Sequence, residues 1–387
     1  MADYFLELEP IHPGCLVNIL QGGKLPKNGM VWELKNQILP LDMYCYLHAK
    51  YGAPNGLQNF LRSDDSDNLI HWEWALASED GVVMIQGHNF RSEVHLIGDF
   101  RDKGLALDQL ITQFKSDFST HGKKMKEVRM GLEKWTQFIN PYKRISSAVE
   151  QHFKKLKELN LDPATDKIPQ PITEEDFANY QQQWTQVAEK YDHAIGLAFG
   201  IRSMLPVLAE SFVNLLLFVL GKPEIKNNSR LFQDTVRRPI DIRVQTLHLN
   251  CNHFSRPVDY TSEPCKAFHS LMNERNDILH GNVDPNKLAF GEVFFNGKVP
   301  VFTAYESFWD KSIGISVQST RMEALDKDYQ TVESFIQYLL DCLDPRVRKE
   351  VDQIASKSQL GFNNGTNRIG ILFPDHIVDF RAFAKTE

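Results

Sequence analysis

An arginine and a histidine lie five positions apart near the end of a predicted helix, in the stretch NERNDILHGN at residues 273–282. The guanidinium of arginine offers a fixed fork of N–H donors that suits a phosphate. Histidine can accept or release a proton near neutral pH. Arg275 and His280 could therefore act together on a phosphodiester without a metal ion.

The helix expected over residues 263–280 places Arg275 where an apolar residue belongs. At 100° per residue, five apolar side chains fall within about 60° of it: Phe268, Leu271, Met272, Ile278 and Leu279. Asn276 and His280 fall about 100–140° away around the helix axis, together with His269. Gly281 suits the left-handed cap of a helix that ends at His280. The pattern predicts that Arg275 lies on the buried face.

A buried guanidinium requires a hydrogen-bonded partner. The preceding apolar helix, expected from about residue 195 to 220, contains the polar exceptions Glu210, Ser211 and Asn214. Glu210 and Asn214 stand one turn apart and share a face, which we expect to look toward Arg275 or Asn276. The simpler structural interpretation is a buried Arg–Glu pair that only fixes helix packing, with a histidine at a helix end.

With these features the motif resembles that of the HEPN superfamily, whose ribonuclease members carry an arginine and a histidine with four to six residues between them. A polar residue commonly follows the arginine, and the matching run here is Arg275-Asn276-Asp277-Ile278-Leu279-His280. The segment AESFVNLLL at residues 209–217 resembles the family's earlier core helix, where an acidic residue often faces the motif. The resemblance covers about residues 174–343.

A second stretch satisfies the same spacing, from Arg243 to His248. This copy lacks the polar residue after the arginine and does not end a long amphipathic helix. We interpret it as a chance match.

The resemblance implies an endoribonuclease in which two domains pair and both motifs line one cleft. The RNA 2′-hydroxyl attacks the phosphate, leaving a 2′,3′-cyclic phosphate, with no metal and no cofactor. His280 would be the base or acid, Arg275 would stabilise the charged phosphorane, and Asn276 would orient the histidine or a phosphate oxygen. Glu210, Asn214 and Asp277 would support them. One motif per chain predicts a homodimer; His269 is a reserve candidate.

The resemblance also suggests a cytoplasmic toxin or abortive-infection effector in antiviral defence, held in check by an antitoxin or regulatory protein. One alternative is a non-catalytic HEPN module for dimerisation or RNA binding within a defence or regulatory complex. Another is a chain that serves as the substrate of a nucleotidyl- or AMP-transferring partner.

The five cysteines are scattered without a CxxC pair, which suits a reducing compartment with free thiols. Metal-ligand types do gather within a short span: His248, Cys251, His253, Cys265 and His269. A zinc site usually shows tighter paired spacing, so we expect no metal and keep zinc as an alternative.

The net charge of −7 gives no global attraction to nucleic acid. Residues 1–100 carry 13 acidic and 6 basic side chains, whereas residues 121–160 carry 10 basic and 4 acidic ones. Three further arginines are RNA-binding candidates: Arg230, Arg237 and Arg238. A solvated helix face explains such patches equally well. The N-terminus has no signal-like pattern, and the apolar window at 207–220 is too short to span a membrane.

Taken together, the patterns predict an α+β protein. Residues 1–160 form a domain with a small antiparallel sheet, Trp72, Trp74 and Leu76 sharing its buried face, and a basic helical extension interrupted at Asn140-Pro141. Residues 161–172, with three prolines, form a linker. Residues 173–345 form an all-α, HEPN-type bundle, capped first at Thr173 and with an inserted hairpin turning at Asn296-Gly297. Residues 346–387 form a loosely structured tail.

Overall fold

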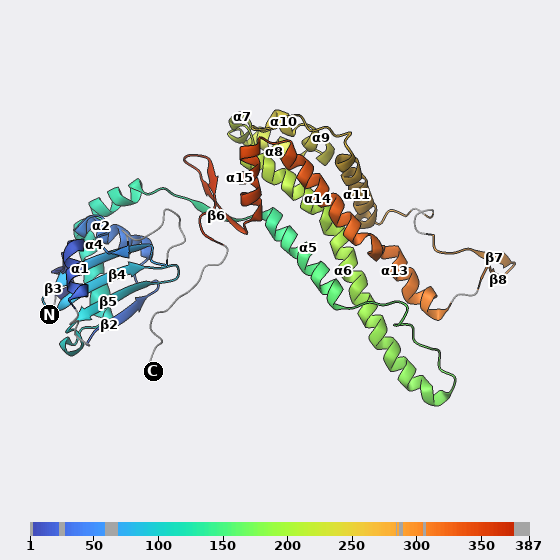
Figure 1. Cartoon of the computed structure of the whole chain (residues 1–387), viewed down its shortest axis with the longest axis horizontal. Coiled ribbons are helices and arrows are strands. Elements are labelled where there is room, and N and C mark those ends of the chain that lie inside the picture. Colours follow the sequence, from blue (N-terminus) through green and yellow to red (C-terminus); the bar gives the residue numbers. More distant parts are fainter. Residues whose placement is uncertain are drawn as a thin grey trace. The chain divides into compact units, whose positions relative to one another are not determined.

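The computed structural model describes residues 3–22, 28–58, 69–283, 285, 289–304 and 307–374. The chain divides into two compact units, one made of residues 1–138 together with 359–387 and the other of residues 139–358. The expected mixture of a small antiparallel sheet near the N-terminus and a helical region after it is confirmed (Figure 1). Each unit is described by itself below.

The first unit is built on a five-stranded antiparallel sheet in the order β1-β3-β4-β5-β2. Its strands are β1 (Glu9–Pro10), β2 (Met30–Leu34), β3 (Trp72–Ser78), β4 (Gly81–Gly87) and β5 (Ser92–Gly98). Its helices are η1 (Tyr4–Leu6), α1 (Pro13–Gln21), α2 (Pro40–Tyr51), η2 (Arg101–Lys103) and α4 (Leu107–Gly131). The predicted meander is thus confirmed as β3–β5, and two short outer strands extend it.

Apolar side chains cover both faces of this sheet. On one face Trp74 and Leu76 are fully buried beside Tyr46 of α2 and Phe114 of α4, and Trp72 is partly buried with them. On the other face Ala75 and Met84 pack with Leu16 of α1. The predicted shared face of the two tryptophans is correct, and the opposite face is a second, smaller core.

The first unit also takes in the end of the described chain. Strands β9 (Gln359–Asn363) and β10 (Arg368–Gly370) form a three-stranded sheet with β6 (Thr136–Ile139), in the order β10-β9-β6. Arg368 lies over the ring of Trp135, 5.2 Å from its centroid. Residues up to 374 are therefore ordered rather than a loose tail, and residues 375–387 lie outside the described part.

The second unit is helical and centres on α6 (Glu174–Leu220). Around it lie α5 (Pro141–Glu158), α7 (Pro223–Lys226), α8 (Ser229–Arg237), α9 (Ile240–Gln245), α10 (Leu247–Asn250), α11 (Glu263–His280), η3 (Asp310–Gly314), α13 (Ile315–Thr320), η4 (Met322–Ala324), α14 (Leu325–Asp341) and α15 (Pro345–Ser356). Helix α5 runs beside α6 (Figure 1). The basic segment 121–160 is accordingly split between α4 of the first unit and α5 of this one.

Helix α6 is one continuous element of 47 residues. The sequence pattern predicts instead one helix over about 174–191 and another over about 195–220, bent or restarted near Pro206, and the predicted division into separate helices is wrong. A proline inside a helix costs roughly 3 kcal/mol. Burial of Leu205, Leu208 and Ala209 beside it offsets that cost, because packing of an apolar face stabilises a helix more than local propensity does. Within the described residues, α6 is the one helix that is long and apolar enough to cross a membrane. However, 56% of its most apolar 18-residue window is buried inside the protein.

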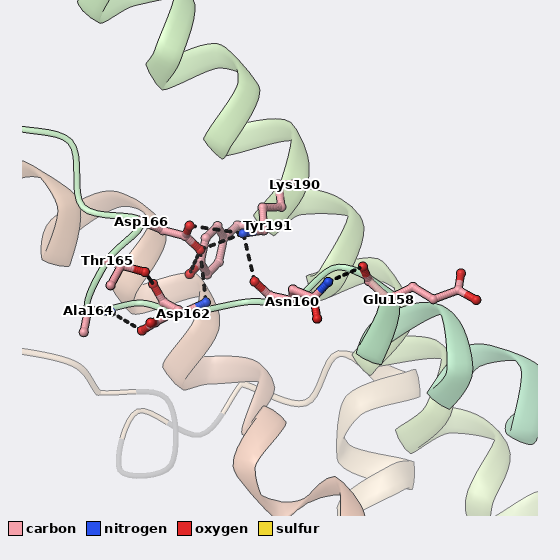
Figure 2. A network of polar contacts seen from close by, with 8 residues as sticks. All are labelled: Glu158, Asn160, Asp162, Ala164, Thr165, Asp166, Lys190 and Tyr191. Carbon is pink, nitrogen blue, oxygen red and sulfur yellow. Dashed lines mark hydrogen bonds and ion pairs between the residues drawn. The ribbon is translucent and has the colours of Figure 1, made fainter.

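The predicted linker is a loop fastened to α6. The Asp166 carboxylate accepts hydrogen bonds from Lys190 Nζ at 2.9 Å and from Tyr191 Oη at 2.8 Å (Figure 2). Lys190 Nζ also donates to the carbonyl of Asn160 at 3.1 Å. Thr173 then caps α6, as predicted, by accepting from the backbone N–H of Asp176 at 3.3 Å. The loop thus belongs to the helical unit rather than separating two domains.

The predicted hairpin is confirmed as β7 (Val293–Asn296) and β8 (Val299–Phe302). Gly297 in its turn has φ +64°, a conformation that favours glycine.

Asn140 joins the start of α5 to the end of α15 and is fully buried. Its Oδ1 accepts from the backbone N–H of Tyr142 at 3.1 Å, which caps α5. Its Nδ2 donates to the carbonyls of Ile354 at 3.1 Å and Lys357 at 2.9 Å. One side chain therefore satisfies backbone groups at two helix ends.

We predict that Asn140→Ala lowers the free energy of unfolding by about 2–4 kcal/mol, because it removes a helix cap and leaves buried carbonyls without donors. Urea denaturation followed by circular dichroism measures the change. Asn228→Ala is the matched control. Asn228 caps only the exposed start of α8, so about 1 kcal/mol is expected there. Equal losses in the two variants would contradict the double role of Asn140.

Candidate functional site

Helix α11 packs one apolar face against α6 and α14. Phe268 is fully buried and stacks on Phe335 of α14, with ring centroids 4.1 Å apart. Leu271 and Met272 continue the buried face toward the C-terminus. Leu279, at the last turn, is 45% exposed. The helix therefore leaves its core at the turn that carries the motif.

Arg275 lies on that face, as predicted, and is partly buried. Its Nη1 donates to Oδ1 of Asn276 at 3.0 Å, which fixes one edge of the guanidinium. Its Nε is buried and, among the described residues, has no hydrogen-bond partner. Within those residues no carboxylate forms an ion pair with Arg275. Within the described part of the chain, the guanidinium therefore has no carboxylate partner and has a donor, Nε, without an acceptor.

His280 is the last residue of α11 and is exposed. Gly281 follows with φ +60°, so the predicted left-handed end of the helix is correct. Asn282 closes this end: its backbone N–H donates to the carbonyl of Asp277 at 3.0 Å, and its Nδ2 donates to Asp277 Oδ1 at 3.0 Å. Asp277 thus shapes the helix end that presents His280.

Glu210 and Asn214 do share a face of α6, but their partner is Arg243 of α9, not Arg275 or Asn276. Arg243 Nη2 donates to Glu210 Oε1, and its Nη1 donates to Asn214 Oδ1 at 2.7 Å. Arg243 is only 5% exposed. The prediction is wrong because helical periodicity gives the direction of a face around its own axis and not the neighbour that covers it. The second Arg-x4-His copy therefore contains a structural arginine.

An ion-pair network beside the motif was missed from the sequence. Arg202 of α6, 7% exposed, donates to Glu274 Oε2 at 2.9 Å, and Arg321 donates to the same oxygen at 2.8 Å. Asp328 of α14 lies 3.8 Å from Arg202 Nε. Burial raises the pKa of the Asp328 carboxyl above its usual range. Glu274 precedes Arg275 directly, so this network fixes the rotation of α11 that sets where Arg275 points.

The sequence did hold a signal for this network. Ala198, Arg202, Leu205 and Ala209 recur at helical spacing and are all buried, so Arg202 interrupts an apolar face just as Arg275 does. Its acidic partners could not be identified, because they come from two other helices.

The remaining candidate residues lie elsewhere. Arg230, Arg237 and Arg238 are exposed at or just beyond α8, and Arg238 forms an ion pair with Asp234 of the same helix. The possible zinc ligands take different partners: His269 Nδ1 lies 3.0 Å from Tyr260 Oη, and the Cys251 thiol donates to the Leu216 carbonyl. In the described ranges no three such side chains gather as a metal site would require.

Two cavities in the described part of the chain lie away from the motif. One, of about 610 Å³ between α5 and α14, is lined by Phe153, Lys154 and Tyr329 among others. The other, of about 700 Å³ beside α1, belongs to the first unit. Neither is lined by Arg275 or His280.

We predict effects of different size on stability for the two arginine environments. Glu210→Ala should lower the free energy of unfolding by roughly 2–4 kcal/mol, since it leaves the buried Arg243 guanidinium without its carboxylate. The loss stays within this range because Glu210 itself is partly exposed, and solvent screens part of the interaction. Arg275→Ala should change it by less than about 1 kcal/mol, because no ion pair is lost. Urea denaturation of both variants beside the parent tests this. A larger loss for Arg275→Ala would identify it as a structural residue.

Comparisons of the chain with protein-family models, with curated proteins and with solved structures found no match. The residues of the site and their contacts therefore carry the functional conclusions that follow.

Proposed function

We propose that the protein is a metal-independent endoribonuclease of HEPN type that acts as a twofold dimer. Arg275, Asn276 and His280 are its catalytic residues, and single-stranded RNA is its substrate. Asp277 shapes the end of α11, and Glu274 holds the helix in place. Glu210 and Asn214 stabilise the fold through Arg243.

The observation that carries this proposal is a difference between three arginines of the helical unit. Arg202 and Arg243 are buried, and each is paired with a carboxylate of the same unit. Arg275 is partly buried, and within the described residues it bonds only to an amide. A partly desolvated guanidinium without a carboxylate favours an anion supplied from outside. A phosphodiester is such an anion, and its two oxygens match the guanidinium fork.

The chemistry requires two proton transfers. A base removes the proton of the RNA 2′-hydroxyl, whose oxygen attacks the adjacent phosphorus. The bond from phosphorus to the 5′-oxygen breaks, an acid protonates that oxygen, and a 2′,3′-cyclic phosphate remains. Arg275 neutralises the added charge on the phosphorane. One His280 per chain provides one of the two transfers, so a second copy provides the other.

The resemblance of the motif supports a role as a growth-arresting toxin or abortive-infection effector in the cytoplasm, regulated by an antitoxin or another protein. All five cysteines are free, as a reducing compartment permits. We assign the first unit the recognition of a trigger or substrate, because the motif belongs to the other unit of the chain.

We predict that expression of the parent arrests growth and that His280→Ala and Arg275→Ala abolish the arrest. In vitro, each variant should cleave RNA at least about 100-fold more slowly, because each removes a group that acts in the transition state. Cleavage should continue in EDTA and leave 2′,3′-cyclic phosphate ends. Growth curves, and gel analysis of RNA end groups, measure these outcomes.

His248→Ala is the matched control, since His248 ends the other Arg-x4-His stretch and should be dispensable. If the His280 and Arg275 variants fold, dimerise and act like the parent, the protein is a non-catalytic HEPN module instead. An intact mass that increases by a nucleotidyl group in cells would indicate a chain modified by a transferase partner.

A further inference from the structure

The hairpin β7–β8 is apolar and exposed on both faces. From the register, Val293, Phe295, Pro300 and Phe302 share one face, while Phe294, Val299 and Val301 share the other. All seven are exposed, Phe295 to 66% and Phe294 to 61%. A contact from the same unit is the ammonium of Lys311, 4.3 Å from the ring centroid of Phe302. A two-stranded hairpin of this kind is marginally stable alone in water, and large exposed apolar patches mark interaction sites.

The two edges of the hairpin differ. Asn296 pairs with Val299 across a two-residue turn, so this pair is hydrogen-bonded. Alternation then makes Phe295 opposite Pro300 a non-hydrogen-bonded pair, whose backbone groups point outward. Pro300 has no N–H, so the outer edge of β8 cannot donate there. Phe295 and Val293 offer complete backbone N–H and C=O groups along the outer edge of β7.

We propose that β7 pairs antiparallel with β7 of a second copy of this chain, giving a four-stranded sheet in the order β8-β7-β7-β8. The register that uses both outward-facing residues sets Val293 of each copy opposite Phe295 of the other. The two copies of Phe294 then meet at the twofold axis. Because Pro300 blocks pairing along the outer edge of β8, only the β7 edge can pair. The sheet therefore stops at two copies of the chain and does not extend further. The pairing rests on the hairpin, and its use to bring two His280 residues together rests on the proposed function.

Charge favours a second copy over nucleic acid as the occupant. Residues 289–304 contain one acid, Glu292, and one base, Lys298. Single-stranded nucleic acid sites combine stacking aromatics with a strongly positive groove. Lys298 and the neighbouring Lys311 do not make such a groove. A nearly uncharged apolar strand is complementary to another copy of itself.

The hairpin supplies part of the area that a dimer needs. A phenylalanine buries roughly 150–250 Å², so partial cover of the hairpin supplies on the order of 400–500 Å² per copy. A stable interface takes about 800 Å² per partner. Exposed apolar residues that precede the hairpin in the sequence are candidates for the remainder: Leu279, Val283 and Phe290 are 45%, 84% and 66% exposed.

The test uses the full chain and measures its mass by light scattering and its dimer dissociation by sedimentation. We expect the parent to be dimeric. Phe295→Pro removes the outward N–H without breaking a bond inside the hairpin, and should weaken dimerisation at least about 100-fold, since two strand-pair hydrogen bonds and two phenyl contacts are lost. Phe90→Ser, at a 56% exposed phenylalanine of the first unit, should leave the dimer unchanged. An unchanged circular dichroism spectrum establishes that Phe295→Pro is folded.

Two further variants and one control probe the geometry. Pro300→Val restores a donor on the second edge and should produce assemblies larger than a dimer. Phe294→Cys, in a Cys15→Ser background, should form an intermolecular disulfide on oxidation, because opposite residues of a non-hydrogen-bonded pair lie about 4.5 Å apart at Cα. Val301→Cys, on the outer strand, should not.

A parent that is monomeric at tens of micromolar, or a Phe295→Pro protein that dimerises like the parent, overturns the pairing. Weaker RNA binding by Phe295→Pro with an intact dimer would likewise overturn it, in favour of a nucleic-acid surface. A monomeric Phe295→Pro protein that still cleaves RNA would uphold the pairing and refute the composite site. A dimeric protein whose RNA cleavage is unchanged by His280→Ala would uphold the pairing and refute the proposed nuclease site.

Discussion

The arrangement of the helical unit depends on neutralising arginines that are buried against α6. A buried guanidinium without a partner costs several kcal/mol, and α6 meets this requirement twice. Its own Arg202 reaches Glu274 of α11 and lies near Asp328 of α14. Its Glu210 and Asn214 receive Arg243 of α9. Sliding or rotating any of these helices would leave a charge unpaired, so their positions are fixed more strictly than apolar packing alone would fix them.

Two adjacent residues of α11 have opposite roles under this constraint. Glu274 is tied to α6 and to Arg321, whereas Arg275, about 100° further around the helix, bonds to its neighbour Asn276. The ion pairs hold the helix so that the next residue keeps a fixed direction without being neutralised. Catalytic groups act best when surrounding contacts hold them in place before substrate arrives. Glu274 is in this sense the positioning residue of the proposed site.

The chain that follows α11 carries several exposed apolar residues. The core face of α11 ends in an exposed Leu279, and the chain continues through Val283 and Phe290 into a hairpin that is apolar on both sides. A partly buried cation without a counter-ion, such as Arg275, destabilises an isolated chain. Binding of a polyanion at an interface with a second chain would remove that cost. The two proposals complement one another: the dimer would supply the second His280, and the RNA would supply the anion that Arg275 lacks.

Local sequence patterns were sufficient to predict several elements. Alternation and 100° steps give the strands of the meander, the bounds of α11 and the place of Arg275 on its helix, and residue types give the Thr173 cap and the hairpin turn. Which faces meet could be seen only once the helices and strands were packed together. In the structure Glu210 pairs with Arg243, and α6 continues without a break through Pro206. Asp166 binds the preceding loop to α6 through Lys190. The strands β1, β6 and β9 form by pairing of short segments with distant ones. The periodicity of a sequence gives the direction of each side chain around the axis of its own helix or strand. Which residues contact each other depends on how separate helices and strands pack, and a local sequence pattern does not contain that information.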